Sequence, residues 1–209
     1  MKILIADDHE VVRQGVRQIL REGFETVTFG EAISAAELLG QARKQKWDLV
    51  LLDISMPGRS GLEALVELKQ QQPKLPVLVL SMFSEQEYAV RALRAGAAGY
   101  LTKKSLGREL VEAVKKVLAG GLFITPTLAE LLAADLGRQE TGPLHEKLSD
   151  REYEVMKLIA AAKSVKEIAG ELSLGEKTVF TYRARLLEKL GLKSDVEVAR
   201  YALQHGLVD

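Results

Sequence analysis

Short runs of consecutive apolar residues alternate with longer segments of helical periodicity over residues 1 to about 120. The runs are ILIA (3–6), LVLLD (49–53), VLVLS (77–81) and GYLT (99–102), with a weaker one in ETVTFGEA (25–32). Each is followed by a segment whose apolar positions recur every three to four residues. Strands that are apolar at nearly every position are typical of a parallel sheet covered by helices on both faces. The pattern therefore predicts an α/β domain of five βα units.

The strand pattern stops after the glycine pair at 120–121. The segment TPTLAELLAADL (125–136) predicts a short helix, since proline is tolerated in a first helical turn. The next segment, GRQETGPLHEK (137–147), is polar and contains glycine and proline, as linkers do. We expect a first domain over residues 1–121, a linker with a short helix over 122–146, and a second domain over 147–209.

The second domain has only helical periodicity, and serine precedes glutamate by three residues at three points. Such pairs can form capping boxes, in which the serine oxygen and the glutamate carboxylate satisfy backbone amides at a helix start. The pairs are Ser149 with Glu152, Ser164 with Glu167, and Ser194 with Glu197. We expect a small all-α domain of four helices.

The amino-acid composition excludes several classes of function. The 209 residues include no cysteine, which excludes disulfides, thiolate metal sites and a cysteine nucleophile. Basic and acidic residues number 29 each, so net charge neither favours nor opposes a nucleic-acid partner. The three histidines lie far apart and show no ligand spacing. No apolar run approaches about 18 residues, so we expect a soluble, cytoplasmic protein.

Three aspartates follow two of the predicted strands. Asp7 and Asp8 end the first strand, and Asp53 ends the third. If the sheet has the flavodoxin-like order 2-1-3-4-5, these strands are neighbours, and the carboxylates converge at the edge where ligands bind. Two like charges about 4 Å apart repel by a few kcal/mol. A hard cation with oxygen ligands relieves this repulsion, and Mg²⁺ fits because it uses few carboxylates and keeps waters.

The fourth and fifth strands bring Ser81 and Lys103 to the same edge. An aspartate beside Mg²⁺, a hydroxyl and an ammonium is equipped to attack phosphorus and to carry the phosphoryl group. The metal and the lysine neutralise charge on the transferring oxygens.

With these residues, the first domain resembles the receiver domain of two-component response regulators. The match lies in the Asp7–Asp8 pair, in Asp53 of DISMPG, and in Ser81, Tyr100 and Lys103. The resemblance implies that Asp53 accepts a phosphoryl group from a sensor histidine kinase. It implies Mg²⁺ bound by Asp8, Asp53 and the backbone carbonyl of Ser55, with Asp7 assisting through water. Ser81 and Tyr100 correspond to the family's switch pair, which reshapes the face around the fourth helix and fifth strand. Beyond supporting its own aspartyl phosphorylation and dephosphorylation, the chain is not expected to be an enzyme.

Two positions depart from the family pattern. Lys103 is followed by Lys104 where many receivers have proline, so a cis-proline turn is not assumed. Met82 is larger than the usual alanine or glycine, which bears on access to the acyl phosphate. A Mg²⁺-dependent aspartyl-phosphatase is an alternative, although such enzymes usually carry an acid where Ser55 stands. A flavin-binding module is disfavoured, because Asp7 and Asp8 would repel the cofactor phosphate.

Residues 148–208 are similar to a LuxR-type helix-turn-helix domain of the NarL/FixJ class, through LSDRE, KEIA, KTV and EKLGL. The resemblance implies a bracing helix from about Lys166 and a recognition helix over 176–190 that enters the major groove of promoter DNA. At about 100° per residue, Leu186 and Leu190 share the face of Val179 and form a core stripe. The candidate DNA contacts are Lys166, Lys177, Thr178, Phe180, Thr181, Tyr182, Ala184, Arg185 and Lys189.

Phe180 and Tyr182 stand where the family usually has lysine and histidine. Phenylalanine donates no hydrogen bond but can contact a thymine methyl group. A regulator whose helical domain binds a protein instead of DNA therefore remains a further alternative. In the final helix, Val196, Ala199 and Leu203 recur at helical spacing. They either pack within the domain or, as the resemblance implies, pair two domains in a homodimer. The expected function is phosphorylation-controlled dimerisation and DNA binding in transcription regulation.

Overall fold

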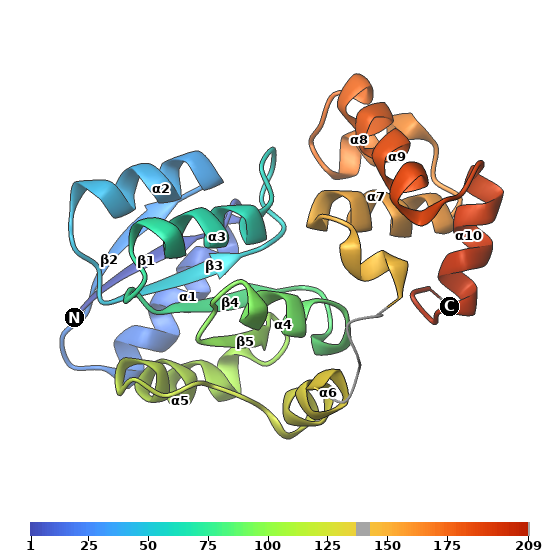
Figure 1. Ribbon diagram of the computed structural model, residues 1–209. Coiled ribbons are helices and arrows are strands. Elements are labelled where there is room, and N and C mark those ends of the chain that lie inside the picture. Colours follow the sequence, from blue (N-terminus) through green and yellow to red (C-terminus); the bar gives the residue numbers. More distant parts are fainter. Residues whose placement is uncertain (137–142, 209) are drawn as a thin grey trace. The chain divides into compact units, whose positions relative to one another are not determined.

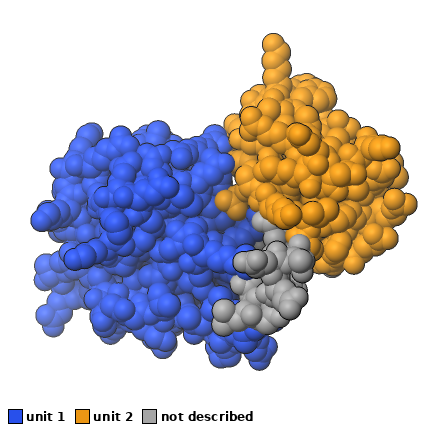
Figure 2. Space-filling model, in the orientation of Figure 1, with its two compact units in different colours: residues 1–137 blue, residues 138–209 orange. Residues whose placement is uncertain are grey.

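The computed structural model describes residues 1–136 and 143–208 (Figure 1). The chain divides into two compact units, Met1–Gly137 and Arg138–Asp209, which are coloured separately in Figure 2. Residues 137–142 of the expected linker lie outside the described residues. No helix in the described ranges is long and apolar enough to cross a bilayer.

The first unit is built on one parallel sheet of five strands. Its strand order is β2-β1-β3-β4-β5, which confirms the predicted flavodoxin-like topology. The strands are β1 (Lys2–Ala6), β2 (Thr28–Ala32), β3 (Leu49–Asp53), β4 (Val77–Ser81) and β5 (Gly99–Thr102). Every residue of β3 and β4 is buried, as expected for central strands covered on both faces.

Helices cover both faces of this sheet (Figure 1). The helices are α1 (Glu10–Gly23), α2 (Ala35–Lys44), α3 (Gly61–Gln71), α4 (Glu85–Arg94) and α5 (Leu106–Leu118). One face is covered by α1 and α5, which contact each other, and the other by the contacting pair α2 and α3. A core cluster lies between the sheet and the pair α1 and α5, and includes Ile3, Ile5, Val16, Leu20, Leu49, Leu51, Leu78, Leu80, Leu101, Leu110 and Val114.

The strand order brings the polar strand ends together. In the register of β1 and β3, Ala6 pairs with Leu52, so Asp7 and Asp53 leave the sheet side by side. In the register of β4 and β5, Ser81 pairs with Thr102, the residue before Lys103. All these groups therefore meet at the carboxyl edge of the sheet, where open α/β folds bind ligands.

The helix predicted near residue 126 is α6 (Pro126–Leu136). It packs on α4, and its Leu128 is fully buried. Thr125 starts the helix with two hydrogen bonds: its hydroxyl donates to Glu85 Oε2 at 2.6 Å and accepts from the Leu128 amide at 3.1 Å. These contacts make α6 part of the first compact unit.

The second unit contains only helices within the described residues. They are the 3₁₀ turn η1 (Leu144–Lys147), α7 (Asp150–Ala160), α8 (Val165–Glu171), α9 (Glu176–Leu190) and α10 (Asp195–Gln204). Val179, Leu186 and Leu190 form the buried stripe of α9 as predicted. Complete capping boxes start α7 and α8.

The third predicted capping box, at the start of α10, is only half formed. The Ser194 hydroxyl accepts from the Glu197 amide at 3.3 Å. The Glu197 carboxylate, however, accepts from the amide of Lys193 at 2.6 Å and not from that of Ser194. The prediction of a reciprocal box is therefore wrong here, because the carboxylate satisfies an amide one residue earlier.

Glu152 joins the start of α7 to the end of α9. Its Oε2 accepts from the Ser149 amide at 2.7 Å and from Lys189 Nζ at 2.6 Å, and its side chain is 3% exposed. Burial works to raise the pKa of Glu152, but the hydrogen bonds from Lys189 and Ser149 hold it below its ordinary value. One carboxylate thus serves as a helix cap and as an ion-pair partner.

This arrangement predicts an acid-sensitive contribution to stability. A carboxyl whose pKa falls on folding stabilises the folded state fully at pH values above its ordinary pKa of 4.5. This stabilisation is lost as the pH falls through the pKa of the folded state. At neutral pH, Glu152→Gln should lower the free energy of unfolding of the second unit by about 1 to 3 kcal/mol. The variant should also lose less stability than the wild type on acidification.

Amide hydrogen exchange in α7 and α9 at neutral and acid pH measures both effects. The matched control is Glu171→Gln, which removes an exposed ion pair with Lys163 and should cost less than about 0.5 kcal/mol. Equal protection of α7 in the two variants would contradict the role assigned to Glu152.

Candidate functional site

The first candidate site centres on Lys103, directly after β5. Its ammonium lies 2.7 Å from Asp53 Oδ2 and 2.7 Å from Asp7 Oδ2. The side chain of Lys103 is 6% exposed, and those of Asp7 and Asp53 are 2% and 0% exposed. One buried cation is therefore shared by two buried carboxylates from neighbouring strands. The structure brings together three of the residues that the sequence placed at this edge.

Burial and charge act in opposite directions on these groups. Burial raises the pKa of Asp53, and the Lys103 ammonium offsets part of this rise. Burial alone would lower the pKa of Lys103, but the charge of Asp53 and the hydrogen bonds to both carboxylates raise it above its ordinary value. Lys103 therefore stays protonated at neutral pH and holds the two carboxylates together.

The turn after β3 fixes the second oxygen of Asp53. The amide of Ser55 donates to Asp53 Oδ1 at 3.0 Å, which places the Ser55 peptide beside the carboxylate. The chain then returns to start α3, where the Gly61 amide donates to the Ile54 carbonyl at 3.1 Å. A Cβ atom at Gly61 would lie 2.3 Å from the carbonyl oxygen of Asp53, so only glycine fits this approach.

The acidic residues fit a divalent cation. Asp7, Asp8, His9 and Asp53 each offer a ligand atom, and these atoms lie within 4.8 Å of one another. Asp8 Oδ1 is buried and lies 2.9 Å from His9 Nδ1. Buried carboxylate oxygens this close together are costly unless a cation offsets their charge. The donor set of carboxylate oxygens suits a hard ion such as Mg²⁺.

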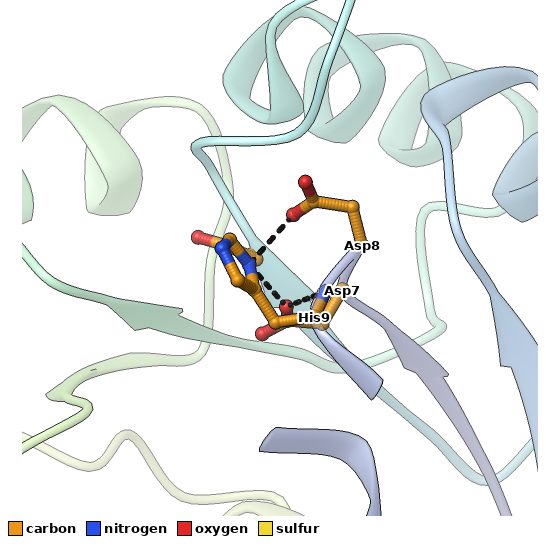
Figure 3. A group of neighbouring side chains, drawn as sticks. Asp7, Asp8 and His9 are labelled. Atoms are coloured by element: carbon orange, nitrogen blue, oxygen red, sulfur yellow. Dashed lines mark hydrogen bonds and ion pairs between the residues drawn. The ribbon is translucent and has the colours of Figure 1, made fainter. Parts of the chain in front are cut away.

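His9 is a neighbour that sequence reasoning missed. Figure 3 shows its ring directed at the carboxylates of Asp7 and Asp8, with Nδ1 3.3 Å from Asp7 Oδ1 and 2.9 Å from Asp8 Oδ1. Its backbone amide also donates to Asp7 Oδ1 at 2.8 Å. Spacing among the histidines gave no sign of this, but adjacency to the two aspartates in the chain was an available signal.

The side chain of Arg13 in α1 binds the loop that carries Asp7. Arg13 Nη1 donates to the Asp7 carbonyl at 2.9 Å, and its Nε donates to Glu31 Oε2 at 2.8 Å. The hydrogen bond from Arg13 lowers the pKa of Glu31, with Arg17 adding to the effect. Asp7 is thus fixed through its backbone as well as through its carboxylate.

The two expected switch residues bind the backbone of the same residue, Phe83, one at its amide and the other at its carbonyl. Ser81 and Tyr100 are both fully buried. The Ser81 hydroxyl accepts from the Phe83 amide at 3.1 Å, and the Tyr100 hydroxyl donates to the Phe83 carbonyl at 3.0 Å. The Phe83 ring lies 4.7 Å from the Tyr88 ring of α4, centroid to centroid. Phe83, which sequence reasoning did not single out, therefore links both switch residues to α4.

The two departures from the family pattern lie at the surface beside this site. Met82 is 60% exposed, and it lines an open apolar pocket with Lys103, Lys104 and the α1 residues Val12 and Val16. No cis peptide bond occurs in the described part of the chain. The Lys103 amide donates to the Ser81 carbonyl at 2.6 Å, so the strand pairing extends to Lys103.

The second candidate site is the outward face of α9. Exposed on it are Lys177, Thr178, Phe180, Thr181, Ala184 and Arg185. Tyr182 is half-buried, on the side of the core stripe. Lys166 is exposed on α8, which precedes a tight turn where Ser173 takes a left-handed φ of 51°. Most candidate DNA contacts thus lie on accessible surface.

Two cations of α9 are already paired within the unit. Lys189 binds the Glu152 carboxylate, which gives this predicted DNA contact a structural partner. Arg183 Nε donates to Asp195 Oδ1 of α10 at 2.7 Å. Neither pairing was visible in the sequence, because each joins residues from different helices.

The predicted dimerisation residues on α10 are largely exposed. Val196 is 78% and Leu203 58% exposed, while Ala199 is half-buried. The helix instead packs within its unit through Val198 and Ala202, which are fully buried. Packing inside the domain therefore does not account for Val196 and Leu203.

The class of protein follows from both sites together with the sequence matches. The family described as the response regulator receiver domain matches residues 3–115, and the luxR family of bacterial regulatory proteins matches residues 146–202. The chain belongs to the response regulator family and combines a receiver domain with a LuxR-type DNA-binding domain. This confirms the predicted class and its transcription-regulating function.

Similar proteins of nearly equal length refine this placement. The response regulator GacA of Pseudomonas aeruginosa is 41% identical over 212 residues, covering 100% of this chain and 98% of that protein. UvrY of Escherichia coli K12 is 35% identical over 208 residues, covering 99% and 95%. RcsB of Salmonella enterica serovar Typhimurium, solved bound to promoter rprA with the phosphomimetic BeF3-, is 27% identical. That structure has a TM-score of 0.63 and covers 96% of this chain and 97% of its own.

The shared ammonium predicts a large effect of removing it. Lys103→Met leaves two buried carboxylates without a counter-charge and should lower the free energy of unfolding of the first unit by about 3 kcal/mol. Urea unfolding in metal-free buffer measures this through Trp47, the one tryptophan of the sequence, which is buried in this unit. The control Lys104→Met removes an exposed lysine and should change stability by less than about 0.5 kcal/mol. Equal midpoints would contradict the bridging role.

Proposed function

We propose that Asp53 accepts a phosphoryl group from a sensor histidine kinase, and that this modification controls dimerisation and promoter binding in the cytoplasm. The observation that carries the proposal is the Lys103 ammonium held 2.7 Å from both Asp7 and Asp53, in a cluster of ligand atoms that also includes Asp8. The receiver supports its own phosphorylation and dephosphorylation, and catalyses no other reaction.

The chemistry at Asp53 is an exchange of one phosphorus bond for another. A carboxylate oxygen of Asp53 attacks the phosphorus of the kinase phosphohistidine, the P–N bond breaks, and an acyl phosphate forms. The Lys103 ammonium contacts the oxygens of the phosphoryl group during its transfer and neutralises their charge. Mg²⁺ bound by Asp8, Asp53 and the Ser55 carbonyl, with Asp7 acting through water, would supply further positive charge to those oxygens.

The switch pair offers a route from Asp53 to α4. A phosphoryl group on Asp53 attracts the Ser81 hydroxyl, which then releases the Phe83 amide that it now accepts from. Tyr100 keeps its hydrogen bond to the carbonyl of the same residue. The peptide group between Met82 and Phe83 therefore reorients while the Phe83 carbonyl stays bound to Tyr100, and the Phe83 ring carries the change to Tyr88 of α4. Because α6 packs on α4, this change reaches the last described helix before the second unit.

The second unit binds duplex DNA through α9 in the major groove. Lys166 and Lys177 supply phosphate contacts, and Thr181 lies on the outward face beside the bases. Val196, Ala199 and Leu203 pair two copies of α10, so that a dimer spans half-sites about one helical turn apart. The relative RcsB has been solved as dimers bound to DNA at 27% identity and a TM-score of 0.61, which supports this arrangement.

Two other functions are less well supported. A Mg²⁺-dependent aspartyl-phosphatase would need an acid two residues after Asp53, where Ser55 stands. A second unit that binds a protein would use the exposed ring of Phe180, but it would leave the outward lysines Lys166 and Lys177 without a role.

Phosphorylation can be tested directly with a small phosphodonor. Acetyl phosphate and Mg²⁺ should add one phosphoryl group to the wild-type chain, as measured by intact-protein mass spectrometry. Asp53→Asn should remain unmodified, because an amide is a poor nucleophile. Asp48→Asn is the matched control, since Asp48 is exposed at the opposite end of the same strand and should not affect the reaction.

The proposal is overturned if Asp53→Asn is modified as fully as the wild type. It is equally overturned if the wild type remains unmodified at saturating donor and metal.

A further inference from the structure

An aromatic ring is exposed at one edge of the outward face of α9. Phe180 is 53% exposed, and its neighbours on this face are Thr181 and Ala184, both exposed. At about 100° per residue, Phe180, Ala184 and Thr181 lie within an arc of about 100° that faces away from the core stripe. This surface is apolar although it lies in the helix proposed to enter DNA.

The hydroxyl of Thr181 does not change this character. It donates to the Lys177 carbonyl of its own helix at 3.0 Å, so its proton is used within α9. Phe180 and Ala184 carry no donor. Arg183 and Lys189 are bound to Asp195 and Glu152. The part of the face between Lys177, one turn earlier, and Glu188, one turn later, therefore presents methyl and ring carbons, with Arg185 beside Thr181.

We propose that Phe180 reads thymine by contact with its C5-methyl group, with Thr181 and Ala184 completing an apolar strip. The inference rests on the proposed binding of α9 in the major groove and names what it recognises there. Of the four bases, thymine alone presents a methyl group in that groove, beside its O4 acceptor, whereas the polar edges of the other bases carry no methyl group. A phenyl ring cannot satisfy those polar edges, so facing them would leave them desolvated and unpaired.

The proposed binding partner is duplex DNA with a thymine facing Phe180, and not an apolar protein surface. Two observations favour DNA. The apolar strip is flanked by Lys177 and Arg185, as a base-reading surface between phosphate contacts requires. The luxR family match covers the whole of α9, and the relative RcsB was solved on promoter DNA.

The test removes the methyl group from the DNA without altering anything else. High-affinity sites are first selected from a random duplex library with the phosphorylated full chain. Each thymine of a half-site is then replaced by deoxyuridine, and dissociation constants are measured at fixed salt. One or two replacements per half-site should weaken wild-type binding about fourfold each, the usual effect of one buried carbon.

Variants assign the effect to the ring. Phe180→Ala should bind the thymine and deoxyuridine duplexes equally, and Phe180→Leu should retain part of the difference. Arg185→Ala is the matched control on the same helix. It should weaken both duplexes alike and keep the full methyl effect, with a shallower dependence on salt.

Two results overturn the inference while leaving DNA binding intact. One is wild-type binding that is unchanged by deoxyuridine at every thymine. The other is a methyl effect that survives in Phe180→Ala, which would assign it to another residue. If the phosphorylated chain selects no duplex even at low salt, the proposed DNA-binding function fails as well, and Phe180 becomes a contact for a protein.

Discussion

The receiver unit depends on one buried cation shared by two buried carboxylates. Asp7 and Asp53 leave adjacent strands side by side, and without Lys103 their repulsion would oppose the strand pairing that places them there. The same ammonium fits the proposed chemistry, because a phosphoryl group on Asp53 would add negative charge where a cation already lies. Stability and function therefore draw on the same three charges, and the β-strand order is what brings them within 2.7 Å.

Ion pairs also join the helices of the second unit, but their basic side chains are less buried than Lys103. Glu152 caps α7 and binds Lys189, and Asp195 binds Arg183, so two basic side chains of α9 are directed toward neighbouring helices. This leaves an outward face with few cations and an exposed phenyl ring. Some basic side chains of α9 thus form ion pairs within the unit, and others remain exposed for the proposed contact with DNA. The overall composition could not reveal this division.

Much of this could be predicted from the sequence, because the patterns involved are local. Apolar runs followed by helical periods define the five βα units, and polar residues at the strand ends define the candidate site once the strand order is given. What could not be predicted depends on contacts between distant segments. The hydrogen bonds that join Ser81 and Tyr100 to the Phe83 backbone, the pairing of Lys189 with Glu152, and the half-formed cap at Ser194 all require side-chain geometry. The placement of His9 was accessible, but only by considering its neighbours in the chain.

We propose that a charge change at Asp53 alters DNA binding through the backbone of Phe83. The most direct measurement is the dissociation constant for a selected promoter duplex, with and without phosphorylation, in the wild type and in Tyr100→Phe. This variant removes only the hydroxyl that binds the Phe83 carbonyl. The account predicts that phosphorylation tightens wild-type binding and that the gain is smaller in Tyr100→Phe at equal phosphorylation. An affinity that does not respond to phosphorylation, or an equal gain in both proteins, would contradict it.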